Sequence, residues 1–324
     1  MTDLPVAAAA EPDSAKPGEP APAAPLAEWS TELNTVLIGQ PAVTEALLIA
    51  LLAGGHVLLE GPPGVGKRLA GRALAASFGA HFAQLQCLPP APGTALHPCL
   101  ARAGAQGQVL LLTGLEQASL AAQAALGEAL QATEVSWADG QPPEQAPVML
   151  IASRNPFDPA GVVPLGEALL DRFLLAMPVA FPTVEDETRM VREVSLSTAP
   201  DMLAIAAPQR LFSGEDVARL QARRGAVKVD DALVNYAVRI VRATRFGAQF
   251  STGAGPRAAI ALVRCAQARA LLHGREYAVA ADIKACAPGV LRHRVRLAMA
   301  QRLDGVALEH VLADQLDQVG APRP

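Results

Sequence analysis

The sequence is poor in aromatic residues and in cysteine. Aromatic residues make up only 4% of its 324 residues, and its four cysteines (Cys87, Cys99, Cys265 and Cys286) form no Cys-x-x-Cys pair. The cysteines therefore predict neither a disulfide framework nor a zinc site, and no metal centre is expected from them. A reducing, cytoplasmic compartment fits this cysteine content best.

Long apolar runs and a strong charge of one sign are also absent. The longest apolar stretch, 46–59, is interrupted by Gly54, Gly55 and His56 and is shorter than the roughly 18 residues of a membrane-spanning helix. The N-terminal sequence MTDLPVAAAAEPD has acids and prolines but no basic segment, so we expect no signal peptide. The net charge of −4 argues against nucleic acid as the main partner, with the basic cluster 292–296 as the one candidate surface.

Lysine is scarce as well, which draws attention to the place where one occurs. Only four of the 27 basic residues are lysines, and one of them, Lys67, ends the glycine-rich sequence GPPGVGK, which follows the apolar run HVLLE. A glycine-rich turn between a strand and a helix points backbone N–H groups at anionic oxygens, and a lysine there reaches the terminal phosphates. The sequence therefore predicts a phosphate-binding loop built from Gly61, Pro62, Pro63, Gly64, Val65, Gly66, Lys67 and Arg68.

The regions around this loop divide into three parts. Up to Thr183, five short apolar runs (56–60, 81–87, 108–113, 147–153 and 174–179) alternate with helical segments. Strands that alternate with helices indicate a parallel sheet covered on both faces. After Thr183 the patterns are helical. We therefore predict an Ala/Pro-rich disordered tail over 1–27, an α/β nucleotide-binding domain over 28–183 and a smaller, all-helical domain over 184–324.

From residue 28 to about residue 320, the sequence resembles the MoxR family of AAA+ ATPases. The segments that carry the resemblance are VLIGQ (36–40), LLIALLAGGHVLLEGPPGVGK (47–67), IASRNP (151–156), LGEALLDRFLL (165–175), GAGPRA (253–258) and ADIKACAPGVLRHRVRL (281–297). The resemblance implies a P-loop AAA+ parallel-sheet domain with a helical lid that binds ATP or ADP. It also implies a ring such as a hexamer, made with itself or a MoxR-type paralogue, and chaperone-like maturation of partner complexes, often with von Willebrand A-domain proteins.

The resemblance also implies roles for four residues outside the loop. Gly39 would line the adenine pocket, and Asn155 would be sensor 1, which orients the attacking water. Arg172 would be the arginine finger offered to the next subunit's γ-phosphate, and Arg257 would be sensor 2, which reaches from the lid to the nucleotide. Each of the last three also has a purely structural interpretation: a turn at Asn155, an ion pair of Arg172 with Asp171, and a helix-start charge at Arg257.

The sequence departs from the family pattern at the metal site and in one insert. Arg68 stands where the motif has the Ser or Thr that ligates Mg²⁺, and Thr113 and Gly114 stand where the family has an Asp and a Glu. The next acid, Glu116, follows two residues later. Between Cys87 and Gln108 the family carries a longer hairpin insert that contacts clients, and this chain has a shorter one. The resemblance implies Mg²⁺, but these positions do not supply its ligands.

These departures predict a catalytically degenerate member of the family. It would bind ATP or ADP with Arg68 in place of Mg²⁺, hydrolyse weakly or not at all, and offer Arg172 to an active neighbour in a ring. Two alternatives remain open: an active ATPase with a compensating acid, for which Glu116 is the candidate, and a scaffold that has lost nucleotide binding.

Overall fold

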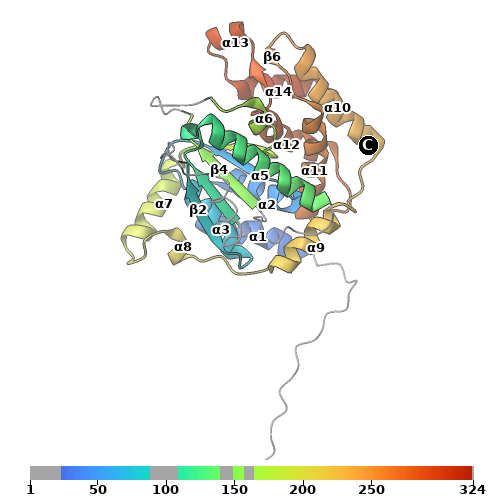
Figure 1. Ribbon diagram of the computed structural model, residues 1–324. Coiled ribbons are helices and arrows are strands. Elements are labelled where there is room, and N and C mark those ends of the chain that lie inside the picture. The colour runs from blue at the N-terminus through green and yellow to red at the C-terminus, as the bar shows by residue number, and fades with distance from the viewer. Residues whose placement is uncertain (1–22, 88–108, 139–148, 157–163, 323–324) are drawn as a thin grey trace, which may run out of the picture.

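The computed structural model describes residues 23–87, 109–138, 149–156 and 164–322. It has an α/β unit followed by a lid built mainly of helices (Figure 1). The five strands are β1 (Val57–Glu60), β2 (Phe82–Gln86), β3 (Val109–Thr113), β4 (Met149–Arg154) and β5 (Leu175–Pro178). They form one parallel sheet in the order β2-β3-β4-β1-β5. All five predicted strands are confirmed.

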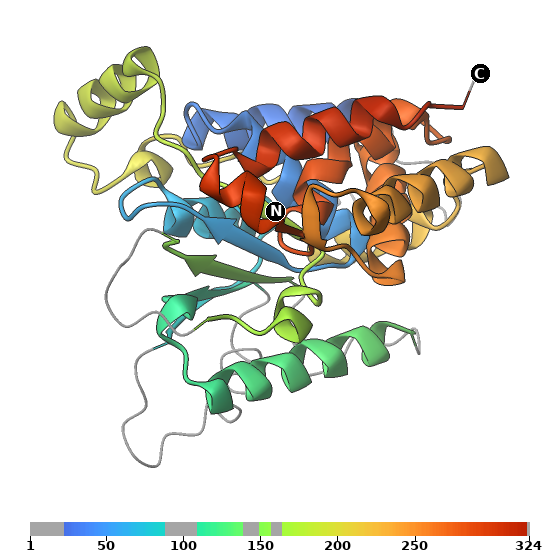
Figure 2. The ribbon, with the colours of Figure 1, turned by 90° about the horizontal axis from the view of Figure 1, so that it is seen from above.

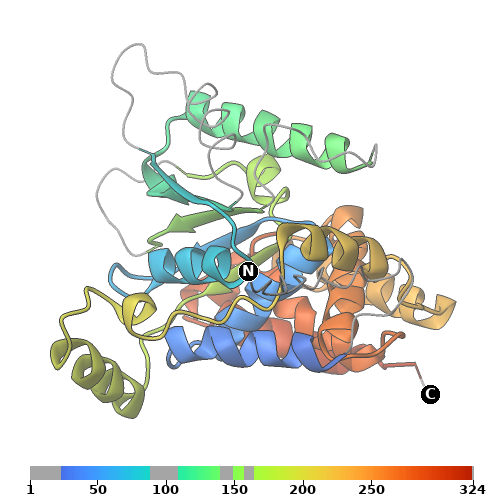
Figure 3. The ribbon, with the colours of Figure 1, turned by 90° about the horizontal axis from the view of Figure 1, so that it is seen from below.

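Both faces of the sheet are buried, which explains why its strands read as continuous apolar runs. Val57 and Leu59 of β1 belong to a core shared with helices α1 (Ala23–Val36), α2 (Pro41–Ala53), α3 (Lys67–Ser77) and the lid. Leu58 points the other way, into a core shared with α5 (Leu120–Ala138) and α6 (Glu167–Leu170). Figures 2 and 3 show α5 on one face of the sheet and α1, α2 and α3 on the other.

Helix α1 begins inside the segment that the sequence predicts as a tail. It starts at Ala23, and both Leu26 and Trp29 are fully buried. The indole Nε1 of Trp29 donates a hydrogen bond to Oγ of Ser77 at 2.7 Å, at the end of α3. Residues 23–27 are therefore part of the fold, whereas the rest of the predicted tail lies outside the described residues.

After Thr183 the chain forms mainly helices, as the sequence predicts. They are α7 (Val184–Ser195), α9 (Gly214–Arg224), α10 (Asp231–Phe246), α11 (Pro256–Leu272), α12 (Ala280–Leu291) and α14 (Leu308–Gln318), with the short α8 (Met202–Ile205) and α13 (Met299–Leu303) between them. The all-helical prediction is incomplete, because β6 (Phe250–Thr252) pairs antiparallel with β7 (Arg296–Leu297). Strands of two or three residues are too short to show an alternating pattern. Within the described ranges, no helix combines the length and apolar character needed to cross a membrane.

A buried carboxylate connects the lid helices to one another and to α2. Asp282 is fully buried and accepts hydrogen bonds from Arg269 and Arg275, each at 2.7 Å, and from the Val279 N–H at 2.9 Å. Arg269 also donates to Glu45 of α2 at 3.0 Å. Burial alone would raise the pKa of Asp282, but these hydrogen bonds outweigh it and hold the pKa below its ordinary value.

We expect Asp282→Asn to lower the free energy of unfolding by about 2–3 kcal/mol, because it leaves two partly buried guanidinium groups without their counter-charge. Since the folded-state pKa of Asp282 is lowered, this stabilisation is fully present above the unfolded carboxyl pKa of about 4 and is lost as the pH falls through the folded value. Urea denaturation between pH 3 and 7 measures both effects. The exposed Asp304→Asn is the control, and equal destabilisation by the two variants would contradict the prediction.

Candidate nucleotide site

The predicted phosphate loop lies between β1 and α3, at the carboxyl edge of the sheet. Gly64 and Gly66 have φ values of 87° and 89°, and residues other than glycine rarely adopt such backbone angles. At Gly61 the requirement is space, because a Cβ atom there would lie 2.3 Å from the carbonyl oxygen of Val179. Gly66 is the N-cap of α3 and caps it without a side chain, and the first turn of α3 contains no acid. The helix start therefore presents N–H groups and a positive dipole end, which fit the phosphates of a nucleotide.

The side chain of Lys67 folds back and binds the backbone of its own loop. Lys67 Nζ donates to the carbonyl oxygens of Gly61 at 2.7 Å and Pro62 at 2.6 Å. Partial burial lowers the pKa of Lys67, and the negative charge of Glu116 opposes this shift. The ammonium group thus lies at the loop, as the motif predicts, and a carboxylate from beyond β3 acts on it.

The ends of β3 and β4 lie beside the loop. The N–H of Gly61 donates to the carbonyl oxygen of Arg154 at 3.1 Å, so Asn155, which follows directly, comes next to the loop as its predicted sensor role requires. Thr113 ends β3, and Gly114 then turns the chain with a φ of 72° into a short 3-10 helix, η1 (Leu115–Gln117).

The carboxyl edge does not provide the ligands expected for Mg²⁺. Arg68 is exposed on the first turn of α3, and Thr113 and Gly114 occupy the end of β3. Glu60 is a buried carboxylate at this edge, but it accepts hydrogen bonds from Arg154 at 2.7 Å and Arg292 at 3.1 Å. Across the part of the chain that the structure describes, no group of three acidic, histidine or cysteine residues could hold a metal ion. The residues present fit a nucleotide's phosphates and do not fit the metal.

Gly39, expected in the adenine pocket, lies near the same edge. Its φ is 74°, and a Cβ atom there would lie 2.8 Å from Oδ2 of Asp186 in α7. The neighbouring Gln40 donates to the carbonyl oxygen of Ala180 at 2.8 Å, one residue after the Val179 that contacts Gly61. The arrangement brings Gly39 toward the loop, and its role toward adenine stays a prediction. The predicted short insert, 88–107, lies outside the described residues.

The two arginines expected to act on nucleotide lie at the opposite edge. Arg172 precedes β5, and Leu175 of β5 pairs with Val57 at the beginning of β1, so Arg172 lies at the amino edge of the sheet, away from the loop. Arg257 donates to Asp171 at 3.2 Å. Arg257 therefore gathers with Arg172 at the amino edge, and the structure does not bring it to the loop of its own chain.

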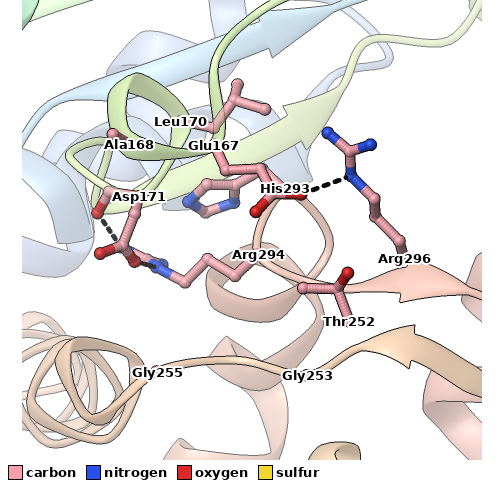
Figure 4. A pocket seen from close by; sticks show the side chains of 10 residues that line it. All are labelled: Glu167, Ala168, Leu170, Asp171, Thr252, Gly253, Gly255, His293, Arg294 and Arg296. Atoms are coloured by element: carbon pink, nitrogen blue, oxygen red, sulfur yellow. Dashed lines mark hydrogen bonds and ion pairs between the residues drawn. The ribbon is translucent and has the colours of Figure 1, made fainter.

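The basic cluster 292–296 anchors the lid to the sheet: Arg294 does so at this amino edge, and Arg292 pairs with Glu60 at the end of β1. Figure 4 shows Asp171, Arg294 and Arg296 around a cavity of about 270 Å³ that α6 and the lid share. Arg294, 8% exposed, donates to Asp171 at 2.8 Å and to the carbonyl oxygen of Phe173 at 2.6 Å. His293 contacts the same carbonyl at 3.0 Å, and burial, followed by the charge of Arg294, lowers its pKa well below the ordinary value. Arg292 and Arg294 therefore fix the lid and offer little surface to nucleic acid.

The fold agrees with comparisons to known proteins. Residues 100–175 match the ATPase family associated with various cellular activities (AAA), and residues 242–315 match the AAA lid domain. The chain is 32% identical to a Mycobacterium tuberculosis protein named chaperone MoxR1, over 90% of this chain and 81% of that protein. The chain belongs to the MoxR family of AAA+ ATPases.

Two further proteins are similar to this chain over most of its length. The chain is 34% identical to an uncharacterized Bacillus subtilis protein, YeaC, over 90% of this chain and 92% of that protein. The crystal structure of a Cytophaga hutchinsonii protein assigned as an ATPase superposes with a TM-score of 0.80 at 26% identity, covering 93% of this chain and 96% of that one. The predicted family and fold are thus confirmed, and the roles of individual residues stay predictions.

We expect Arg294→Gln to lower the free energy of unfolding by about 2–4 kcal/mol, because it leaves buried carbonyl oxygens without their donor and Asp171 with only its longer contact to Arg257. The neighbouring Arg296→Gln is the matched control: its pair with Glu167 is exposed on both sides, so its loss should cost under about 0.5 kcal/mol. Thermal and urea unfolding measure the difference. Similar losses in both variants would show that the lid does not depend on Arg294.

Proposed function

We propose that this MoxR-family protein binds ATP or ADP through residues 61–68 and acts as a chaperone-like assembly factor. The observation that carries the proposal is the loop itself: Lys67 opens α3 directly after two left-handed glycines, beside the carboxyl ends of β1 and β4. A backbone of this form binds phosphate oxygens with N–H groups and the helix dipole. The family membership and the relative named as a chaperone support the rest of the proposal.

We further propose that hydrolysis is weak. Phosphoryl transfer depends on positioning and on stabilisation of the charge that develops on the phosphate oxygens, to which Mg²⁺ normally contributes. With Arg68, Thr113 and Gly114 at the three expected positions, the chain lacks the usual hydroxyl, the metal carboxylate and the base. A guanidinium is a good phosphate partner and repels a nearby cation, so Arg68 suits a site that takes nucleotide without Mg²⁺.

The placement of Arg172 and Arg257 supports action between subunits. Both lie at the amino edge of the sheet, whereas the loop lies at the carboxyl edge. In a head-to-tail ring the two different surfaces of adjacent subunits meet, so these arginines can approach a neighbour's nucleotide. We propose a ring, such as a hexamer, of this chain alone or with a MoxR-type paralogue, with a von Willebrand A-domain protein as a candidate client.

Calorimetric titration of ATP and ADP tests nucleotide binding. We expect the affinity to change less than about threefold when Mg²⁺ is replaced by a chelator, and Lys67→Ala to weaken binding about 10- to 100-fold by removing a charge-assisted phosphate contact. Lys228→Ala, at an exposed lysine of the lid, is the control. No binding of any nucleotide would instead indicate a scaffold that has lost its ligand, and binding that requires Mg²⁺ would contradict the role given to Arg68.

Arg172→Ala tests action across a subunit boundary. We expect unchanged nucleotide affinity in the isolated chain, because Arg172 lies at the edge away from its own loop, but at least a tenfold loss of phosphate release in the assembled ring, alone or mixed with an active paralogue. Light scattering establishes assembly, and a phosphate-release assay follows turnover. Arg302→Ala, at an exposed position of α13, is the control. A weakened nucleotide affinity in the monomeric variant would contradict this placement.

A further inference from the structure

One buried carboxylate near the loop lacks the partners that such groups normally have. Glu116 is 7% exposed, and its Oε2 atom is buried without a hydrogen-bond partner among the described residues. A buried carboxylate oxygen that accepts no hydrogen bond lowers the stability of the fold. The arrangement at Glu60 is different, since Arg154 and Arg292 engage both of its oxygens. A glutamate at position 116 therefore does not stabilise the fold, which points to a role for its carboxylate in function.

The local backbone explains why this carboxylate lies at the loop. Gly114 adopts a left-handed conformation, and η1 follows at once. Leu115 is fully buried in the core beneath β3, and Glu116 follows it inward at the carboxyl edge. Sequence alignment alone places Glu116 two residues beyond the family's catalytic acid, but the turn at Gly114 keeps the carboxylate at the edge where that acid would act.

The negative charge of Glu116 acts on the pKa values of two neighbouring groups, Lys67 and Cys87. It opposes the lowering of the pKa of Lys67, and, together with burial, it raises the pKa of Cys87, which follows β2, to about 11. The carboxylate therefore lies within electrostatic range of the loop lysine on one side and of the end of β2 on the other. Because Lys67 is the group that would reach the terminal phosphates, Glu116 lies at the phosphate end of the site.

We propose that Glu116 is the general base of this site. A water molecule beside its carboxylate attacks the γ-phosphorus of ATP, and the bond from that phosphorus to the bridging β–γ oxygen breaks. ADP leaves with the bridging electrons, and the proton of the water passes to Glu116 and then to the phosphate product or to solvent. The inference rests on the proposed nucleotide binding, and it assigns the weak hydrolysis to a residue outside the family's usual positions.

The test compares Glu116→Gln and Glu116→Asp with Glu128→Gln, which changes an exposed glutamate of α5, in the full chain. We expect Glu116→Gln to reduce phosphate release at least about 100-fold, with ADP affinity within about threefold of wild type. ATP affinity should rise a few-fold, because a negative charge facing the terminal phosphate is removed. Glu116→Asp should keep part of the turnover, and Glu128→Gln should change nothing.

Thermal unfolding separates this role from a structural one. Because the amide removes a buried charge whose Oε2 atom accepts no hydrogen bond, Glu116→Gln should unfold at the same temperature as wild type or higher. A lower unfolding temperature, or an unchanged ratio of ATP to ADP affinity, would overturn the assignment. So would phosphate release that persists in Glu116→Gln, or a wild-type chain that binds ATP and releases no phosphate. Loss of nucleotide binding by the wild-type chain is a separate result, which would overturn the proposed function itself.

Discussion

Burial of the parallel sheet on both faces is the constraint on which the rest of the structure depends. A parallel sheet buries apolar side chains above and below itself, and here α1, α2 and α3 cover one face while α5 and α6 cover the other. Polar chemistry is thereby confined to the two ends of the strands. The phosphate loop lies at the carboxyl ends, and Asp171 and Arg172 lie at the amino end, before β5.

This separation leaves Arg172 and Arg257 at the edge away from the loop of their own chain. The strand β1 lies between the loop and the segment that carries Asp171, and Arg294 holds the lid to that segment through the same carboxylate that receives Arg257. The lid is thus fixed in a position where Arg257, the predicted sensor 2, lies away from the loop of its own chain. In the proposed ring, one copy's amino edge meets the next copy's carboxyl edge, and these arginines can then reach the neighbour's nucleotide.

Local patterns in the sequence were sufficient to predict the strands, the loop and the mainly helical part after Thr183, because glycine, proline and apolar periodicity act over a few residues. They did not place residues 23–27 in α1, since burial of Leu26 depends on packing against distant helices. The pairing of β6 with β7 and the contact of Arg257 with Asp171 depend on how the lid docks. The inward position of Glu116 likewise depends on the turn at Gly114, which an ungapped alignment cannot show.

The three departures from the family pattern, at Arg68, Thr113 and Gly114, all change the charge around the loop. A bound triphosphate brings several negative charges, which Mg²⁺ normally offsets. Here Lys67 and Arg68 are the cations in and beside the loop, and the end of β3, with Thr113 and Gly114, is neutral. Replacing the metal carboxylate by Thr113 removes a negative charge that would have opposed phosphate binding without Mg²⁺. One carboxylate, Glu116, remains near Lys67, and a single buried acid is what polarising a water molecule requires. We propose that a site of this composition binds phosphate and keeps a base without the metal.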